Sequence, residues 1–195
     1  MTDKRKVGAA PSEKRTAILD ATQDLIRTEG YAAVSTRRVA ARAGIKPALV
    51  QHYFASMEDL LLAVYRRAAD HSIAAQVAAL ASPRPLHALW QLSRDAARAG
   101  LAVEFMALAN HRKSIRAEIV AYSERARVLQ AQALQAILAD TALARADMPA
   151  IGVSLLHAGV ARGLGMEEGL GIVGGHDEAD AIVARWLDAI EPANA

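Results

Sequence analysis

The residues best suited to polar chemistry in this 195-residue sequence gather in two short runs between positions 35 and 53. They carry hydroxyl, cationic, amide and ring-nitrogen groups, which hydrogen-bond to phosphate oxygens and to the edges of nucleic-acid bases. The set comprises Thr36, Arg37, Lys46, Gln51, His52 and Tyr53. Such chemistry requires that the two runs be held close together on rigid elements.

Two short helices joined by a tight turn are predicted to hold these residues. Ser35 is a favourable N-cap for a helix beginning at Thr36, and Gly44 supplies the left-handed conformation that ends it. Pro47 suits the first position of the second helix, where a missing N–H costs nothing. Pro47 and Ala48 also keep the start of that helix slim enough to enter a major groove. The pattern indicates a helix-turn-helix.

Helical patterns extend over the rest of the chain, and no convincing strand is present. Helices are expected from Ser12 to Gly30, from Ser56 to about residue 80, and over 86–99, 102–112, 114–141, 149–166 and 177–190. We therefore expect an all-α fold with a flexible basic arm (1–11), a helix-turn-helix DNA-binding domain (12–56) and a further helical domain (57–195), to which the family resemblance described below assigns effector binding and dimerisation. Residues 169–174 match a dinucleotide-binding pattern, but no strand precedes them, so a loop is expected and no cofactor.

Composition narrows the class of protein. Residues 1–56 hold ten Lys and Arg against five acidic residues, whereas the remainder holds 13 against 16. A basic end on an acidic body is typical of a protein that touches phosphate at one end. The absence of cysteine excludes disulfides and thiolate chemistry, the histidines lack metal-ligand spacing, and no catalytic set stands out. No signal peptide or membrane span is recognisable, so a cytoplasmic location is expected.

The order and spacing of these motifs resemble the TetR family of bacterial transcription regulators. The resemblance is carried by Ile18-Leu19-Asp20-Ala21, Gly30-Tyr31, the segment 34–40, Ala43-Gly44-Ile45 and the segment 52–60, and it covers about residues 12 to 65. It implies a DNA-binding N-terminal domain, followed by a variable helical domain that binds a ligand and dimerises through the last two long helices.

The resemblance also implies which residues meet DNA. Thr36 and Arg37 correspond to the pair at the start of the second helix that reaches the duplex. The recognition helix and its flank correspond to Lys46, Pro47, Ala48, Leu49, Gln51 and Tyr53, and His52 is a candidate for a phosphate contact. Leu49 is equally compatible with a core position, whereas Val50 and Phe54 are expected in the core. Met57 stands where a phosphate-binding Lys is usual, and Arg38 and Lys46 are the expected substitutes.

The middle and last helices offer candidates for a ligand pocket and a dimer interface. The pocket candidates are Trp90, Phe105, Met106, Tyr122 and His157, a mixture that suits a small, largely hydrophobic organic effector. The interface candidates are Ile182, Val183, Trp186 and Leu187, which form one apolar stripe. The expected partners are therefore double-stranded DNA with a pseudo-palindromic site, a second copy of the chain and this effector.

Two other functions are compatible with the sequence. The first is a DNA-binding protein without an effector, either a constitutive repressor or an architectural protein. The second is a helical enzyme or lipid carrier whose basic end is incidental. Sequence-independent DNA binding would favour an architectural protein, and substrate turnover without DNA affinity would favour an enzyme.

Overall fold

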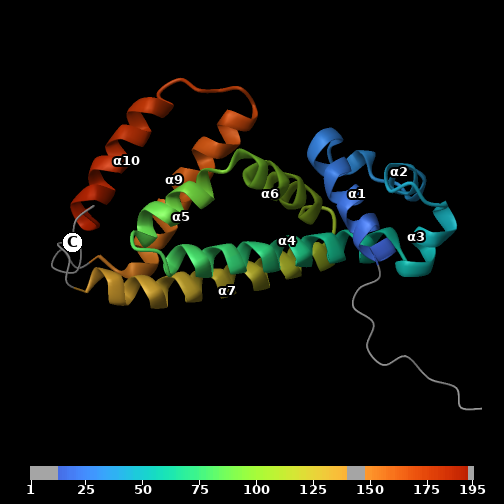
Figure 1. Ribbon diagram of the computed structural model, residues 1–195, viewed down its shortest axis with the longest axis horizontal. Helices are drawn as coiled ribbons and strands as arrows, with labels where there is room; N and C mark the ends of the chain where they lie inside the picture. Colours follow the sequence, from blue (N-terminus) through green and yellow to red (C-terminus); the bar gives the residue numbers. More distant parts are fainter. Residues whose placement is uncertain (1–12, 140–147, 193–195) are drawn as a thin grey trace, which may run out of the picture. The chain divides into compact units, whose positions relative to one another are not determined.

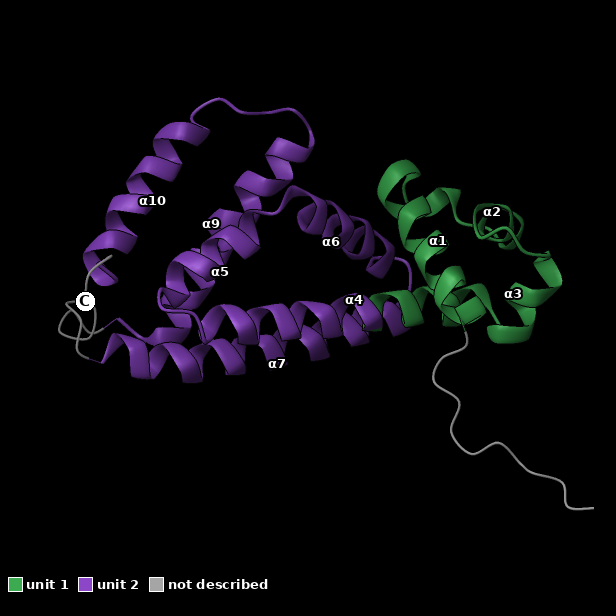
Figure 2. Cartoon of the chain, viewed as in Figure 1, with its two compact units in different colours: residues 1–66 green, residues 67–195 purple. Residues whose placement is uncertain are grey.

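The computed structural model describes residues 13–139 and 148–192, and within these ranges it is helical, with no strand. The chain divides into two compact units, residues 1–66 and 67–195 (Figure 2). The helix α4 (Met57–Leu80) contributes its first ten residues to unit 1 and the remainder to unit 2. The all-α fold expected from the sequence is confirmed, and the predicted arm at 1–11 lies outside the described residues.

Unit 1 is built from short helices whose ends follow local sequence signals (Figure 1). They are α1 (Glu13–Glu29), a 3-10 turn (Tyr31–Ala33), α2 (Thr36–Arg42), α3 (Pro47–Tyr53) and the start of α4. Ser35 caps α2 by accepting a hydrogen bond from the Arg38 N–H at 3.4 Å, and Gly44 has a φ of +66°. Ser56 caps α4 in the same way, accepting from the Asp59 N–H at 3.1 Å.

The core of unit 1 fixes α2 and α3 against α1 and α4. Its large fully buried apolar side chains are Ile18, Leu25, Ile26, Val39, Leu60 and Val64. Val50 and Phe54 are also buried, at 2% and 6% exposure, which confirms that they are core residues. The guanidinium of Arg15 lies 5.1 Å from the centre of the Phe54 ring, which adds a cation–π contact to the end of α3.

Unit 2 is a helical bundle in which α9 has the central place. Its helices after α4 are α5 (Pro85–Arg94), α6 (Ala96–Ala109), α7 (Lys113–Leu138), α9 (Ala150–Gly169) and α10 (His176–Ile190). The helix α9 packs against α5, α6 and α7, while α10 packs against α5. The principal core joins α5, α7, α9 and α10 through Leu86, Trp90, Leu134, Leu138, Ala150, Val153, Ala161 and Leu187.

The break between α5 and α6 differs from the prediction. A break was expected near Gly100, but Gly100 lies inside α6, and the break falls at Asp95. The reason is local, because an Asp95 carboxylate oxygen accepts a hydrogen bond from the Arg98 N–H at 3.0 Å and caps α6. The glycine-rich segment expected as a loop begins one residue later than predicted, because Gly169 ends α9; residues 170–175 separate the last two helices, and Gly175 caps α10 in the left-handed conformation.

Candidate nucleic-acid interface and ligand cleft

One face of α3 is open to solvent. Pro47, Ala48, Gln51 and His52 are exposed, whereas Val50, on the opposite face, is buried. Leu49 and Tyr53 are half-buried at the edges of this face, and the Tyr53 and His52 rings meet edge to face at 5.3 Å. The helix therefore offers a surface of small and hydrogen-bonding side chains, the kind that reads base edges in a major groove.

The start of α2 adds an exposed cation to the same unit. Arg37 and Lys46 are exposed, and neither has an ion-pair partner among the described residues, while Thr36 is half-buried. The short turn between α2 and α3 brings together the two runs of predicted DNA-binding residues. That each of them touches DNA stays a prediction.

The other two arginines of α2 are held by acidic residues of α1. Arg38 forms an ion pair with Glu29, and Arg42 forms ion pairs with Asp24 and, at 2.9 Å, with Glu29. Arg38, which we expected to replace the missing phosphate-binding Lys, therefore already has an acidic partner within the unit, and its contact with phosphate stays a prediction. These ion pairs leave Arg37 as the uncompensated cation of α2.

The pocket residues expected from the sequence do not share one cavity. Phe105 is buried at 2% exposure, whereas its neighbour Met106 is 59% exposed, so the two point to different sides of α6. Tyr122 donates a hydrogen bond to Ser72 at 2.7 Å and lies in a polar network described below. His157 and Trp90 do meet, edge to face at 5.5 Å, but both belong to the core.

The His157 ring is held neutral by its surroundings. Burial removes the water that would solvate the charged ring, so it lowers the pKa of His157 below its ordinary value. The hydrogen bond of Nε2 to the Leu86 carbonyl, at 3.0 Å, and the charge of Glu191 oppose this effect, whereas His87 reinforces it. The ring is a structural donor in the core.

A neutral polar network crosses the interior of unit 2. Gln76, 7% exposed, donates to Ser72 at 3.2 Å and to the Tyr122 hydroxyl at 3.1 Å, and it accepts from Gln130 at 2.6 Å. Ser154 in turn donates to Gln130. The network ties α4, α7 and α9 together. Sequence reasoning missed Gln76, Gln130 and Ser154 because nothing local distinguishes a buried glutamine from a surface one.

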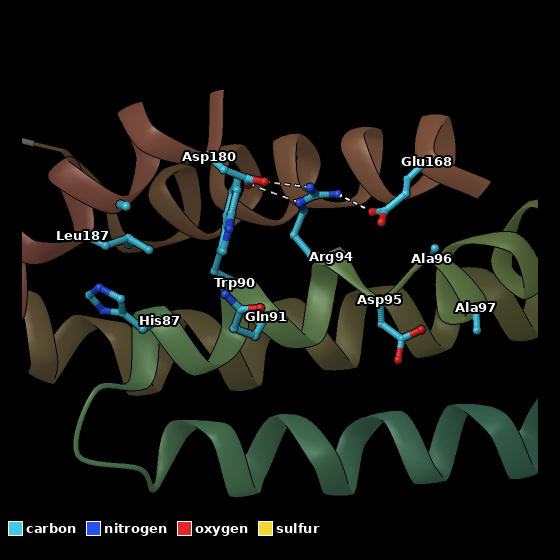
Figure 3. Close-up of a pocket in the computed structure, with 11 residues that line it drawn as sticks. His87, Trp90, Gln91, Arg94, Asp95, Ala96, Ala97, Glu168, Asp180 and Leu187 are labelled. Atoms are coloured by element: carbon cyan, nitrogen blue, oxygen red, sulfur yellow. Dashed lines mark hydrogen bonds and ion pairs between the residues drawn. The ribbon is translucent and has the colours of Figure 1, made fainter. Parts of the chain in front are cut away.

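A polar cleft lies between α5, the start of α6, the end of α9 and α10 (Figure 3). It encloses about 720 Å³, and of the predicted pocket residues only Trp90 lines it. Arg94 lies at its centre, bonded to Asp180 through Nε at 3.2 Å and an outer nitrogen at 2.7 Å, and to Glu168 at 2.9 Å. The hydrogen bonds to Asp180 are the main cause that raises the pKa of Arg94, so the guanidinium stays charged.

The dimer candidates on α10 also need correction. Leu187 is 1% exposed within its own chain and belongs to the core, so it has no surface left for a partner. Val183 and Trp186 pack against the same core and are partly buried, whereas Ile182 is 59% exposed. The periodic stripe on α10 is therefore mainly an intramolecular packing face.

Together, the two short helices, the capped turn and the exposed face of α3 define a helix-turn-helix DNA-binding protein. Residues 18–64 match the family model for bacterial regulatory proteins of the tetR family. These residues therefore form a DNA-binding domain of the tetR family.

Individual relatives agree with this assignment. The chain is 42% identical over 83 residues to the HTH-type transcriptional regulator BetI of Rhizobium meliloti (strain 1021), and the match spans 40% of each chain. A solved transcriptional regulator of Streptomyces coelicolor A3(2), SCO7518, is 26% identical, with a TM-score of 0.59 over 83% of this chain and 99% of that one. A TetR-family regulator from Rhodococcus sp. shares the fold at 19% identity, with a TM-score of 0.75 over 92% and 100% of the two chains.

Two further features bear on function. Among the described residues no helix is both long enough and apolar enough to cross a bilayer. Within the same part of the chain no three His, Asp or Glu side chains come together in a way that could hold a metal ion.

Proposed function

We propose that this chain regulates transcription as a homodimer that binds a pseudo-palindromic DNA site and is released from it by a small organic effector. The observation that supports this most strongly is the exposed face of α3, together with the exposed Arg37. The ion pairs of Arg38 and Arg42 with α1 leave this face and Arg37 to carry the interaction with DNA. Two copies would place their recognition helices in successive major grooves, about 34–36 Å apart.

An apolar face on α9 supports the homodimer. Its large side chains are 41% to 64% exposed, and they are Ile151, Leu155, Leu156, Val160 and Met166. Three glycines, Gly152, Gly159 and Gly163, lie on the same side, and a Cβ added at any of them would meet nothing within 4 Å. Since apolar side chains gathered on one exposed helix face are typical of interfaces, we propose this face as the contact with a second copy.

Sequence selection by the intact protein tests the proposed function. The purified chain is incubated with fragmented genomic DNA, and bound fragments are recovered and sequenced. We expect one pseudo-palindromic motif to be enriched. Recovery of fragments without a common motif would favour an architectural DNA-binding protein and contradict the proposal.

A further inference from the structure

The cleft around Arg94 has an excess of negative charge. Its lining includes the carboxylates of Asp95, Glu168 and Asp180 and a single permanent cation, Arg94. Glu168 and Asp180 already form ion pairs with Arg94. Asp95 lies 3.6 Å from Arg98, a cation that does not line the cleft. The lining therefore carries more acid than base.

This arrangement disfavours an anionic ligand. To reach the Arg94 guanidinium, an anion would have to displace Asp180, which bonds it through two nitrogens, and would then face the displaced carboxylates. A cation, in contrast, can approach the outer sides of the same carboxylates, because Glu168 is 50% exposed and Asp180 is 37% exposed. The electrostatics of the cleft select positive charge.

The remaining walls suit an organic body rather than a bare ion. Ala96, Ala97 and Ala184 supply accessible apolar surface, and Figure 3 shows the largely buried Trp90 between His87 and Arg94. The cleft, at about 720 Å³, has the size of a small-molecule site and far exceeds a metal ion. Gln91, which is exposed, adds a neutral hydrogen-bonding group at the rim.

We propose that this cleft binds an organic cation, with an ammonium group facing Glu168 and Asp180 and a compact apolar body against Trp90 and Ala184. The role of this ligand as the effector rests on the proposed function, whereas its binding to the cleft does not. Arg94 belongs to α5, Glu168 to α9 and Asp180 to α10, so a cation on the outer sides of these carboxylates weakens their attraction to Arg94 and loosens the ties between three helices. Since α9 carries the proposed dimer face, binding in the cleft shifts the arrangement of that face.

A charge series of otherwise similar probes tests the cleft. Benzylammonium, benzyl alcohol and benzoate share an aromatic ring and differ in charge, and their binding to the full chain is measured by calorimetry without DNA. We expect benzylammonium to bind about tenfold more tightly than either of the others, with an affinity that falls as salt increases. Equal affinity across the series, preference for benzoate or no binding at millimolar concentration would overturn the assignment.

Variants locate the binding. Glu168→Gln is expected to weaken benzylammonium binding about threefold, and the double variant Glu168→Gln with Asp180→Asn about tenfold. Ala184→Phe fills the cleft from an exposed position without removing charge, and it should abolish binding even if the double variant fails to fold. Glu178→Gln removes an exposed acid of α10 that does not line the cleft, and it should change nothing. An equal loss in Glu178→Gln would show non-specific charge attraction.

A DNA-affinity measurement separates the two proposals. Benzylammonium that binds the cleft and weakens DNA binding supports both. If it binds but leaves DNA affinity unchanged, the effector role is overturned while the cleft assignment stands. A protein that binds no DNA, with or without the probe, contradicts the proposed function instead.

Discussion

At the scale of single residues, the arginines of α2 make different interactions although they are close in sequence. Arg38 and Arg42 neutralise carboxylates of α1, whereas Arg37 has no such partner among the described residues. The sequence predicted Arg37 as a contact, but it did not reveal that Arg38 forms an ion pair within the unit. The Glu29 partner lies nine residues away, across the 3-10 turn, so its proximity depends on the fold.

Replacing Arg37 is expected to weaken specific DNA binding. Arg37→Ala should cost about 1–3 kcal/mol of binding free energy and lower the slope of log K against log salt by about 1, because one phosphate or base contact is lost. The matched change Arg38→Ala should leave that slope unchanged, since its charge is held by Glu29. Fluorescence anisotropy over a salt series measures both, and equal slopes for the two variants would contradict the assignment.

His157 is expected to make stability depend on pH. Because the folded chain lowers the pKa of His157, the unfolded chain binds the proton more readily, and stability is lost as pH falls below about 6.5. His157→Gln should reduce the drop in melting temperature between pH 7 and pH 5. His71→Gln, at an exposed position, should leave the drop as in the original protein. An identical drop in all three proteins would show that the buried ring is not responsible.

At the scale of elements, capping signals explain which parts of the fold were predictable. The boundaries of α2, α3 and α4 follow from Ser35, Pro47 and Ser56, residues within the element or directly before it. The cap of α5 is different, because Glu191, after the end of α10, accepts hydrogen bonds from the Leu86 N–H at 2.8 Å and the His87 N–H at 3.2 Å. Because this capping residue lies more than one hundred residues away in the chain, the sequence around α5 gives no sign of it.

The close packing of α9 on α5 depends on one glycine. A Cβ at Gly165 would lie 2.8 Å from the Arg94 carbonyl oxygen, so Gly165→Ala should force the helices apart and cost about 1–3 kcal/mol of unfolding free energy. Gly100→Ala is the matched control, since Gly100 lies inside α6 and a Cβ there meets nothing within 4 Å. This control should stabilise by about 0.5–1 kcal/mol. Urea unfolding measures both, and a neutral Gly165→Ala would contradict the close approach.

At the scale of the whole molecule, the sequence predicted an apolar interface on α10, and most of that stripe packs within its own chain. The stripe on α10 and the exposed face of α9 are both apolar, and periodicity reports that a helix has an apolar side without saying which neighbour covers it. Leu187 is covered by its own chain, whereas Leu156 is 64% exposed. The same limit applies to the ligand site, since Trp90, Phe105 and Met106 were predicted together and point to different surroundings.

A charge on the α9 face should separate the copies. Leu156→Glu is expected to produce monomers, because an unpaired carboxylate would have to be buried in the interface. Arg185→Glu, at an exposed position on α10, is the control and should remain dimeric. Sedimentation velocity measures both. A dimeric Leu156→Glu protein with unchanged affinity between copies would exclude this face.

The central claim is that two copies of α3 read successive major grooves, and methylation interference on the selected DNA site tests it most directly. Methyl groups at guanine N7 lie in the major groove, so they block side chains that approach base edges there. We predict interference in two symmetric clusters whose centres lie one helical turn, about 10–10.5 base pairs, apart or a multiple of it. Both clusters should weaken in the Arg37→Ala protein. Interference at a single cluster, or none at all with binding intact, would contradict the account.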